Sequence, residues 1–193
     1  SVGLGRRYAR IGGVNLRWKR PHPASILCRM FFCFGSPRSG TTLISQSLSA
    51  HPNITIPSET DFIIPAAFIF DRVKDLQTRR LMLGTLITSS EYFPHSLGEY
   101  LQTSEVLEIV ARNVGDFSAL LDALYSAIAE RSGAKIAGDK SPNDIHFVRI
   151  LGKINAIGAS TKIIHIVRDI RDVVAALVKR NMSPGIETQY ARM

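Results

Sequence analysis

The chain has 193 residues, 45% of them hydrophobic, and 24 Lys and Arg against 16 Asp and Glu give it a formal net charge of +8. This length fits one domain with a substantial core. No run approaches the ~18 apolar residues of a transmembrane helix, and the start is too basic and too weakly hydrophobic for a signal peptide. The composition therefore disfavours a membrane-spanning protein and predicts a cytoplasmic globular protein whose charge suits anionic ligands.

Residues 1–24 are predicted to be a basic extension that precedes a domain at 25–193. No acidic residue accompanies its six cations, Arg6, Arg7, Arg10, Arg17, Lys19 and Arg20. Such a segment can contact membrane phosphates or nucleic acid, or stay solvated. Its only large rings are Tyr8 and Trp18, whereas nucleic-acid surfaces interleave aromatic and basic residues. We therefore expect a solvated or partly helical extension without a nucleic-acid partner, and membrane contact stays open.

The strand predicted at residues 31–34 leads into a loop that is bounded by two glycines and followed by a helix. The loop and first helical residues are Gly35, Ser36, Pro37, Arg38, Ser39, Gly40, Thr41, Thr42 and Leu43. N–H groups at a helix start have no intrahelical partner, and the helix dipole adds positive potential there. This unit is therefore predicted to bind an anion without a metal, with Arg38 as the cation inside the loop.

The same loop has the glycine spacing of the ATP-binding P-loop, Gly-x-x-x-x-Gly-Lys-[Ser/Thr], but not its lysine. Gly35 and Gly40 are correctly spaced, and Thr42 fits the residue that holds magnesium. Thr41, however, occupies the position of the lysine that reaches the β- and γ-phosphates. The pattern disfavours an ATP-dependent kinase, which stays an alternative.

Two cysteines lie around this first strand. Cys28 and Cys33 are an odd number of residues apart, so their side chains are expected on opposite faces and without a mutual disulfide. Neither a four-ligand metal spacing nor a Cys-x-x-Cys motif is present. We expect both to be small core residues in a reducing compartment.

After the first helix, residues 49–60 return the chain toward the sheet and bring Glu59 to its edge. A carboxylate placed there can accept the proton of an attacking hydroxyl, which is worth about 10²- to 10⁴-fold in rate. The alternatives for Glu59 are a surface acid and a helix cap. His51 is a second candidate base, although a histidine before proline at a helix end more often closes a turn.

Residues 61–133 are predicted to be mostly helical. Apolar residues recur at helical spacing in 79–86, 105–114 and 117–129. Residues 91–95 interrupt this pattern with Tyr92, Phe93 and Pro94. They form either a loop that faces a substrate or a packed turn.

A second strand-to-loop unit follows at residues 134–143. The loop contains Asp139, Lys140 and Pro142, and Lys140 either reaches an anion or forms a solvated pair with Asp139. A helix predicted at 143–157 is then the crossover of a right-handed βαβ unit.

The third such unit begins with a β-branched run at residues 162–167, which predicts a buried parallel strand. Arg168 follows the strand directly. A helix is predicted at 170–180, and Asp169 suits its N-cap.

These motifs together resemble a known family. The loop 36–42 closely resembles the 5′-phosphosulfate loop of sulfotransferases that use 3′-phosphoadenosine 5′-phosphosulfate (PAPS). With His51-Pro52 and Glu59-Thr60, the order is most similar to that of protein-tyrosine sulfotransferases and their bacterial relatives. The resemblance covers about residues 29–180. It implies an α/β fold, a P-loop-type parallel sheet flanked by helices, without the family's C-terminal closing segment.

The resemblance also implies the donor site. The 5′-phosphosulfate would be held by Arg38, Ser39, Gly40, Thr41, Thr42 and Leu43. Arg168, the first arginine of an Arg-Asp-x-Arg-Asp-Val segment, would hold the 3′-phosphate. Two separate phosphate sites fit a donor with phosphate at both ends, and no metal is implied.

The chemistry implied is transfer of a sulfuryl group to a hydroxyl acceptor. Glu59 lies 21 residues after Arg38, which matches the family's catalytic base. Lys140 matches a lysine that points at the sulfuryl oxygens, so Lys140 and Arg38 would stabilise developing charge from two sides. Region 62–133 would line the acceptor cleft. The acceptor class stays open between peptide tyrosine, carbohydrate, lipid and small alcohol.

One position departs from the family pattern. Ala176 stands eight residues after Arg168, where relatives usually carry a serine that contacts the 3′-phosphate. A charge-assisted hydrogen bond contributes roughly 1.5 to 3 kcal/mol, so donor binding is expected to be about tenfold weaker or more unless Ser183 substitutes. A catalytically inactive nucleotide-binding protein is therefore an alternative to the enzyme.

Overall fold

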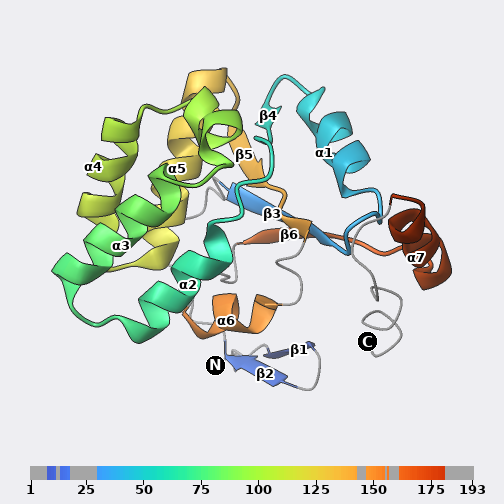
Figure 1. The fold of residues 1–193 in the computed structure, drawn as a ribbon, viewed down its shortest axis with the longest axis horizontal. Helices are drawn as coiled ribbons and strands as arrows, with labels where there is room; N and C mark the ends of the chain where they lie inside the picture. Colours follow the sequence, from blue (N-terminus) through green and yellow to red (C-terminus); the bar gives the residue numbers. More distant parts are fainter. Residues whose placement is uncertain are drawn as a thin grey trace, which may run out of the picture.

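The computed structural model describes residues 8–11, 14–17, 30–142, 147–154, 156 and 161–180 (Figure 1). Its strands are β1 (Tyr8–Ile11), β2 (Val14–Arg17), β3 (Met30–Gly35), β4 (Ile54–Thr55), β5 (Ile136–Asp139) and β6 (Lys162–Ile166). Its helices are α1 (Thr41–Ser49), α2 (Ile63–Arg72), α3 (Leu76–Thr88), α4 (Thr103–Asn113), α5 (Phe117–Ser132), α6 (Val148–Lys153) and α7 (Ile170–Lys179), with short 3-10 helices η2 (Phe93–His95) and η3 (Leu97–Glu99).

Four parallel strands form the main sheet in the order β4-β5-β3-β6. Phe32 of β3 pairs with Asp139 of β5 on one side and with Ile163 of β6 on the other. Thr55 of β4 pairs with Ala137 of β5. Because all four strands run in the same direction, the loops that follow their carboxyl ends meet at one edge of the sheet. The predicted α/β fold with a parallel sheet is confirmed.

The central strand β3 is the most deeply buried part of the sheet, and all six of its residues are buried. Phe32 and Phe34 point to the same face, and their rings stack with centroids 5.1 Å apart. Gly138 on β5 leaves room for Phe31, because a Cβ there would lie 2.4 Å from the Phe31 ring. Cys33 is buried and free of a disulfide, whereas Cys28 lies outside the described residues.

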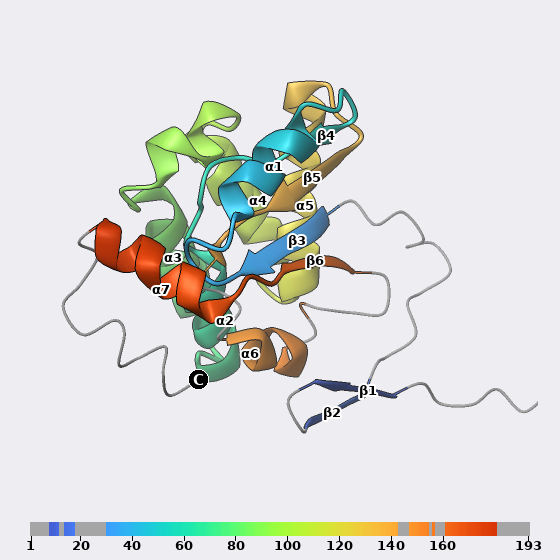
Figure 2. The same cartoon turned by 90° about the vertical axis from the view of Figure 1, so that its right-hand side faces the viewer.

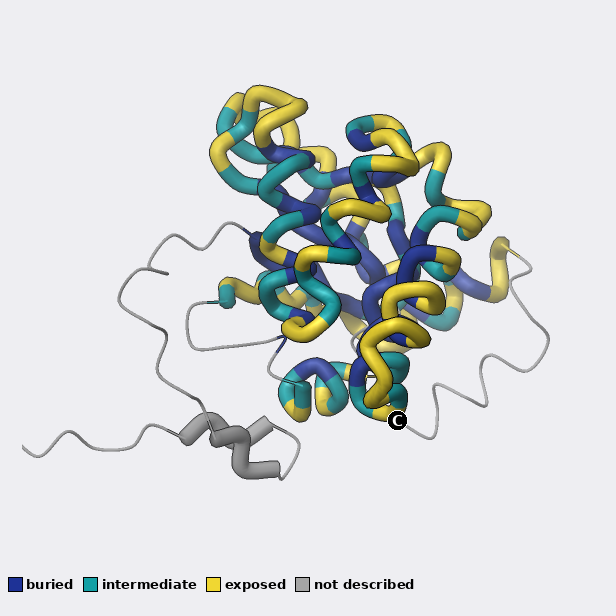
Figure 3. The backbone as a smooth tube through the Cα atoms, turned by 90° about the vertical axis from the view of Figure 1, so that its left-hand side faces the viewer, coloured by how far each residue is buried: buried dark blue, intermediate teal, exposed yellow. Residues whose placement is uncertain are grey.

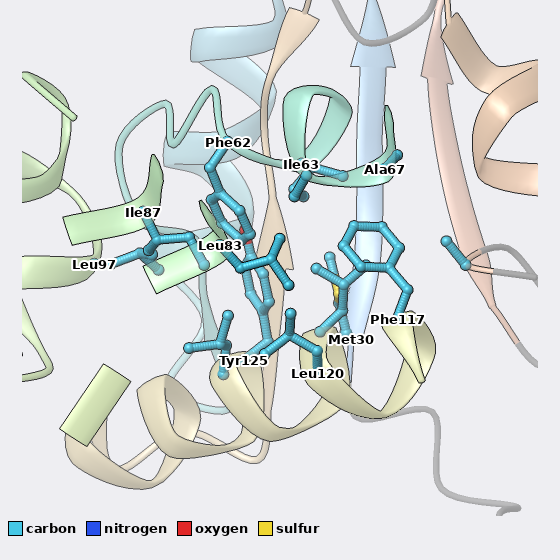
Figure 4. Packing of buried hydrophobic residues seen from close by; sticks show 14 of the residues in the cluster. Met30, Phe62, Ile63, Ala67, Leu83, Ile87, Leu97, Phe117, Leu120 and Tyr125 are labelled. Carbon is cyan, nitrogen blue, oxygen red and sulfur yellow. The ribbon is translucent and has the colours of Figure 1, made fainter. Parts of the chain in front are cut away.

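Helices cover both faces of the sheet. Figures 1 and 2 show α2 to α5 gathered on one face and α1 with α7 on the other. The main core lies where α2, α3 and α5 approach the sheet, and Tyr125, Phe62 and Leu83 are among its largest fully buried side chains (Figure 4). The burial pattern follows this layering, because the helix residues that face the sheet are buried and those that face away from it are exposed (Figure 3).

The helical region predicted between the first two strand-loop units is observed as α2 to α5. Asp75 caps α3 by accepting a 2.7 Å hydrogen bond from the Thr78 N–H, and Asp116 caps α5 by accepting one from Ala119. The helix predicted at 143–157 is observed only as α6, and residues 143–146 are not among those described. No helix in the described part of the chain is long and apolar enough to cross a lipid bilayer.

Strand β6 differs from the prediction of a buried strand. Among the described strands it pairs with β3 alone, so it forms an edge of the sheet. Lys162, Ile163 and His165 are exposed, Ile163 to 39%. A β-branched run predicts a strand but not its neighbours, and burial depends on those neighbours.

The basic extension, expected to be solvated or partly helical, shows no helix among its described residues. Its described residues form the antiparallel pair β1 and β2, with Ile11 opposite Val14. The sequence carried a signal for this, since Gly12 and Gly13 separate two short runs of mixed apolar and polar residues. A Gly-Gly pair between such runs is typical of a two-residue hairpin.

Candidate active site at the carboxyl edge of the sheet

Each strand of the main sheet delivers one candidate functional segment to the same edge. The loop 36–40 follows β3, Glu59 follows β4, Lys140 follows β5 and Arg168 follows β6. These segments are far apart in sequence and are brought together because the strands are parallel.

The loop after β3 has the backbone geometry of an anion cradle. Gly40 takes a left-handed φ of 105° at the N-cap of α1, and Arg38 takes a positive φ of 67°. A Cβ on Gly35 would lie 2.7 Å from the Ser39 hydroxyl and 3.0 Å from the Ile166 carbonyl oxygen, so only glycine fits where β3 meets the loop. A strained backbone at Arg38 is common where a loop must present groups to a ligand.

The cradle offers several hydrogen-bond donors. The first intrahelical bond of α1 runs from the Ile44 N–H to the Gly40 carbonyl oxygen at 3.1 Å, so the N–H groups of Thr41, Thr42 and Leu43 precede the helical ladder. The Ser39 hydroxyl is buried and has no hydrogen-bond partner among the described residues. A buried unpartnered hydroxyl beside free helix N–H groups fits a phosphate or sulfate.

Arg168 lies beside this cradle. Its guanidinium donates a 3.2 Å hydrogen bond to the Arg38 carbonyl oxygen, and its Nε lies 3.6 Å from an Asp172 carboxylate oxygen. Asp169 serves as the N-cap of α7, as predicted, by accepting a 2.9 Å hydrogen bond from the Arg171 N–H. The structure therefore places two arginines from different strand ends next to each other, at the start of α1 and the start of α7.

The acid and the lysine form an ion pair. Lys140 Nζ lies 2.6 Å from Glu59 Oε1, and the Lys140 side chain is only 8% exposed against 37% for Glu59. The alternative of a solvated Asp139–Lys140 pair is wrong, because both residues are buried. A carboxylate capable of accepting a proton and a cation capable of stabilising negative charge thus lie in direct contact.

A buried carboxylate, Asp139, precedes Lys140 directly in the sequence. Asp139 is fully buried, and its Oδ1 accepts hydrogen bonds from the Tyr125 hydroxyl at 2.6 Å and the Thr60 hydroxyl at 2.8 Å. Burial raises the pKa of Asp139, against the hydrogen bonds from Tyr125 and Thr60, which lower it. Sequence reasoning missed this cluster, because Tyr125 sits in an apolar helical stripe and Asp139 stood beside a lysine.

A pocket of about 450 Å³ opens in front of the ion pair. It is lined by Ser58, Glu59, Glu91, Tyr92, His95 and Lys140. The segment 91–95, which the sequence left open between a substrate-facing loop and a packed turn, includes η2 and contributes Glu91, Tyr92 and His95 to the pocket lining. The pocket therefore joins the candidate base and cation to a surface on which a second substrate can lie.

Other candidates lie apart from this pocket. His51 accepts a hydrogen bond from the Asn53 N–H at 3.1 Å through Nδ1, so its ring closes the turn after α1 as the sequence suggested. Ala176 is half-buried on α7, and Ser183 lies outside the described residues. Within the described ranges, no group of three or more His, Cys, Asp or Glu is placed to hold a metal ion.

Comparison with known proteins gives matches at the level of family and fold. A family model described as "Sulfotransferase family" matches residues 31–191. The chain is similar to the sulfotransferase domain of the Synechococcus PCC 7002 olefin synthase, with a TM-score of 0.54, 21% identity, and coverage of 86% of this chain and 57% of that one.

A second solved structure, the sulfotransferase domain from the curacin biosynthetic pathway, gives a TM-score of 0.46 and 20% identity over 81% of this chain and 52% of that one. The chain thus spans less than two thirds of either structure. No match to a curated protein was found.

Proposed function

The chain belongs to the sulfotransferase family, and from this premise we propose that it transfers a sulfuryl group from PAPS to a hydroxyl acceptor. The observation that carries the proposal is the arrangement at the carboxyl edge of the sheet. There the anion cradle at α1 and the Glu59–Lys140 ion pair follow neighbouring strands. An anion site alone would fit many nucleotide-binding proteins, whereas the paired carboxylate and ammonium supply a base and a charge stabiliser for group transfer.

On the donor side, the chain's own groups match a ligand with two anionic ends. The Ser39 hydroxyl and the N–H groups at the start of α1 would hold the 5′-phosphosulfate, together with the Arg38 guanidinium. Arg168, which contacts the Arg38 carbonyl oxygen, would hold the 3′-phosphate. Neither function requires a metal, because fixed N–H groups and guanidinium groups provide the positive potential.

On the acceptor side, the hydroxyl would enter the pocket in front of Glu59. Bound PAPS supplies the sulfuryl group and leaves as adenosine 3′,5′-bisphosphate. As the acceptor oxygen bonds to sulfur, Glu59 takes its proton, and the electron pair of the broken sulfur–oxygen bond stays on the 5′-phosphate. Lys140 and Arg38 stabilise the negative charge that develops during this transfer. The product is a sulfate ester of the acceptor.

An inactive nucleotide-binding protein is the second candidate. It is favoured by Ala176, which offers no hydroxyl to a 3′-phosphate from α7. An ATP-dependent kinase is less well supported, since Thr41 occupies the place of the phosphate-binding lysine.

Calorimetric titration separates these candidates. We expect adenosine 3′,5′-bisphosphate to bind in the micromolar range without metal, and ATP with magnesium to bind clearly more weakly. Labelled PAPS incubated with a panel of hydroxyl acceptors should then give labelled sulfate esters. Binding without turnover on any acceptor would favour the inactive protein, a preference for ATP with magnesium would favour the kinase, and binding of neither ligand would refute a donor site in this chain.

A further inference from the structure

The pocket beside the ion pair has more carboxylates than cations. Among its lining side chains, Glu59 and Glu91 are acidic, and Lys140 is the one lysine or arginine. Lys140 is already engaged by Glu59 at 2.6 Å. Glu91 makes no ion pair with any described residue of the chain. The pocket therefore carries an uncompensated negative charge, although the whole chain has a net charge of +8.

A third carboxylate, Asp61, interacts electrostatically with two pocket residues, Glu59 and Tyr92. Asp61 follows Glu59 by two residues and takes a left-handed φ of 50°, a conformation that aspartate tolerates better than most residues. It is half-buried, and burial followed by the nearby Glu59 charge raises its pKa. No ion pair joins Asp61 to a described residue.

The three carboxylates act on one exposed aromatic ring. Asp61 first, then Glu91, and to a smaller extent Glu59 raise the pKa of the Tyr92 phenol. Tyr92 is 41% exposed and lines the pocket. A negative potential beside an accessible ring favours a cation, both through Coulomb attraction and through contact with the ring face.

Resting on the sulfuryl transfer proposed above, we infer that the acceptor is a hydroxyl compound that also carries a cationic group, such as an ammonium. Its hydroxyl would face Glu59, and its cation would lie between Glu91, Asp61 and the Tyr92 ring. Acceptors rich in carboxylates or sulfates would be repelled by the same side chains. Lys140 offsets only part of this negative charge, because it is already paired with Glu59.

Three phenols that differ in charge test the inference. At a pH of roughly 7.5, tyramine is cationic, 4-ethylphenol is neutral and 3-(4-hydroxyphenyl)propionate is anionic. Each is titrated into the full chain in the presence of adenosine 3′,5′-bisphosphate, and binding is followed by the NMR signal of the His95 ring. That signal is assigned among the five histidines with a His95→Gln variant. We expect tyramine to bind about five- to tenfold more tightly than 4-ethylphenol, and the propionate to bind most weakly.

Two variants and one control assign the effect to the carboxylates. Glu91→Gln and Asp61→Asn should each reduce the advantage of tyramine by about two- to fivefold and leave 4-ethylphenol unchanged. Glu99→Gln removes an exposed acid of η3 that does not line the pocket, and it should change neither ligand. Equal binding of the three phenols, tighter binding of the propionate, or no response of His95 to tyramine would overturn the inference.

The outcomes distinguish this inference from the function on which it rests. Equal sulfation and binding of tyramine and 4-ethylphenol would refute charge selection while the transferase activity stands. Preferential tyramine binding in a chain that fails to bind the bisphosphate would instead leave a cation-selective pocket and refute the transferase. In that case the titration is repeated without the bisphosphate.

Discussion

The Thr60 hydroxyl donates a 2.8 Å hydrogen bond to Asp139, directly beside the ion pair between Glu59 and Lys140. Two contacts therefore join the segment after β4 to the end of β5: a buried hydrogen bond between Thr60 and Asp139, and an ion pair between Glu59 and Lys140 at the pocket. Asp139 also accepts a hydrogen bond from Tyr125 of α5. Glu59 and Lys140 are thus each adjacent in sequence to a member of a hydrogen-bond network whose centre is the fully buried Asp139.

Replacing Asp139 by alanine should destabilise the fold. The Thr60 and Tyr125 hydroxyls would lose this acceptor, which we expect to lower the free energy of unfolding by about 1 to 3 kcal/mol. Urea denaturation of Asp139→Ala and of an exposed control, Glu99→Ala, measures this loss, and the control should stay within about 0.5 kcal/mol of the parent. An Asp139→Ala variant as stable as the control would mean that the network contributes nothing to stability.

The same carboxylate predicts a dependence of stability on pH. Burial raises the pKa of Asp139 above its ordinary value of 3.8, so the folded state holds this proton more tightly than the unfolded state. The contribution of the group to stability is therefore full below the ordinary carboxyl pKa and is lost as pH rises through the raised pKa. Asp139→Asn keeps an oxygen acceptor but does not titrate.

Denaturation of the parent and of Asp139→Asn across pH 4 to roughly 8 measures this effect. The parent should lose stability relative to the variant as pH rises, because only the parent must bury a charge. A difference that stays constant with pH would show that Asp139 titrates alike in the folded and unfolded states.

Removal of the cradle arginine should weaken donor binding. Arg38→Ala deletes a guanidinium that would contact the 5′-phosphate, and a charge-assisted hydrogen bond of roughly 1.5 to 3 kcal/mol corresponds to at least tenfold in affinity for adenosine 3′,5′-bisphosphate. Calorimetry on this variant is compared with Arg112→Ala, which removes an exposed arginine of α4 paired with Glu108. Equal affinities in Arg38→Ala and Arg112→Ala would count against the cradle as the anion site.

Restoring a hydroxyl on α7 should have the opposite effect. Ala176→Ser adds the group that relatives usually carry eight residues after the arginine represented here by Arg168. A new hydrogen bond to the 3′-phosphate should raise bisphosphate affinity by up to about tenfold. Adenosine 5′-phosphate, which lacks the 3′-phosphate, is the matched ligand and should bind parent and variant alike. A gain for both ligands, or for neither, would argue against 3′-phosphate binding at α7.

The sequence predicted those features of the structure that are determined by residues close together in the chain. The cradle was predicted because Gly35, Arg38 and Gly40 lie within one turn between a strand and a helix. The gathering of motifs at one edge followed from parallel strands. The ion pair joins residues that are 81 positions apart in the sequence. Glu59 and Lys140 were each predicted as site residues, but their contact was not predicted.

Features that depend on distant neighbours were not predicted. The exposure of β6 reflects the absence of a described strand beyond it, which its own β-branched residues do not encode. The polar cluster of Thr60, Tyr125 and Asp139 was also not predicted. Thr60 and Asp139 are 79 residues apart, and the helical spacing of Tyr125 indicated an ordinary core residue. The β1–β2 pair, by contrast, was missed despite a local Gly-Gly signal.

The role of Glu59 is tested by separating turnover from binding. Glu59→Gln keeps the shape of the side chain but removes the proton acceptor, so kcat for sulfation should fall by about 10²- to 10⁴-fold. Bisphosphate affinity should change by less than about twofold, because the cradle and Arg168 lie on other strand ends. The variant also leaves the buried Lys140 ammonium without its carboxylate, so its free energy of unfolding is measured in parallel. A folded Glu59→Gln protein that binds the bisphosphate normally and keeps full turnover would remove Glu59 as the base. Parallel loss of turnover, affinity and stability would instead make its ion pair with Lys140 a structural contact.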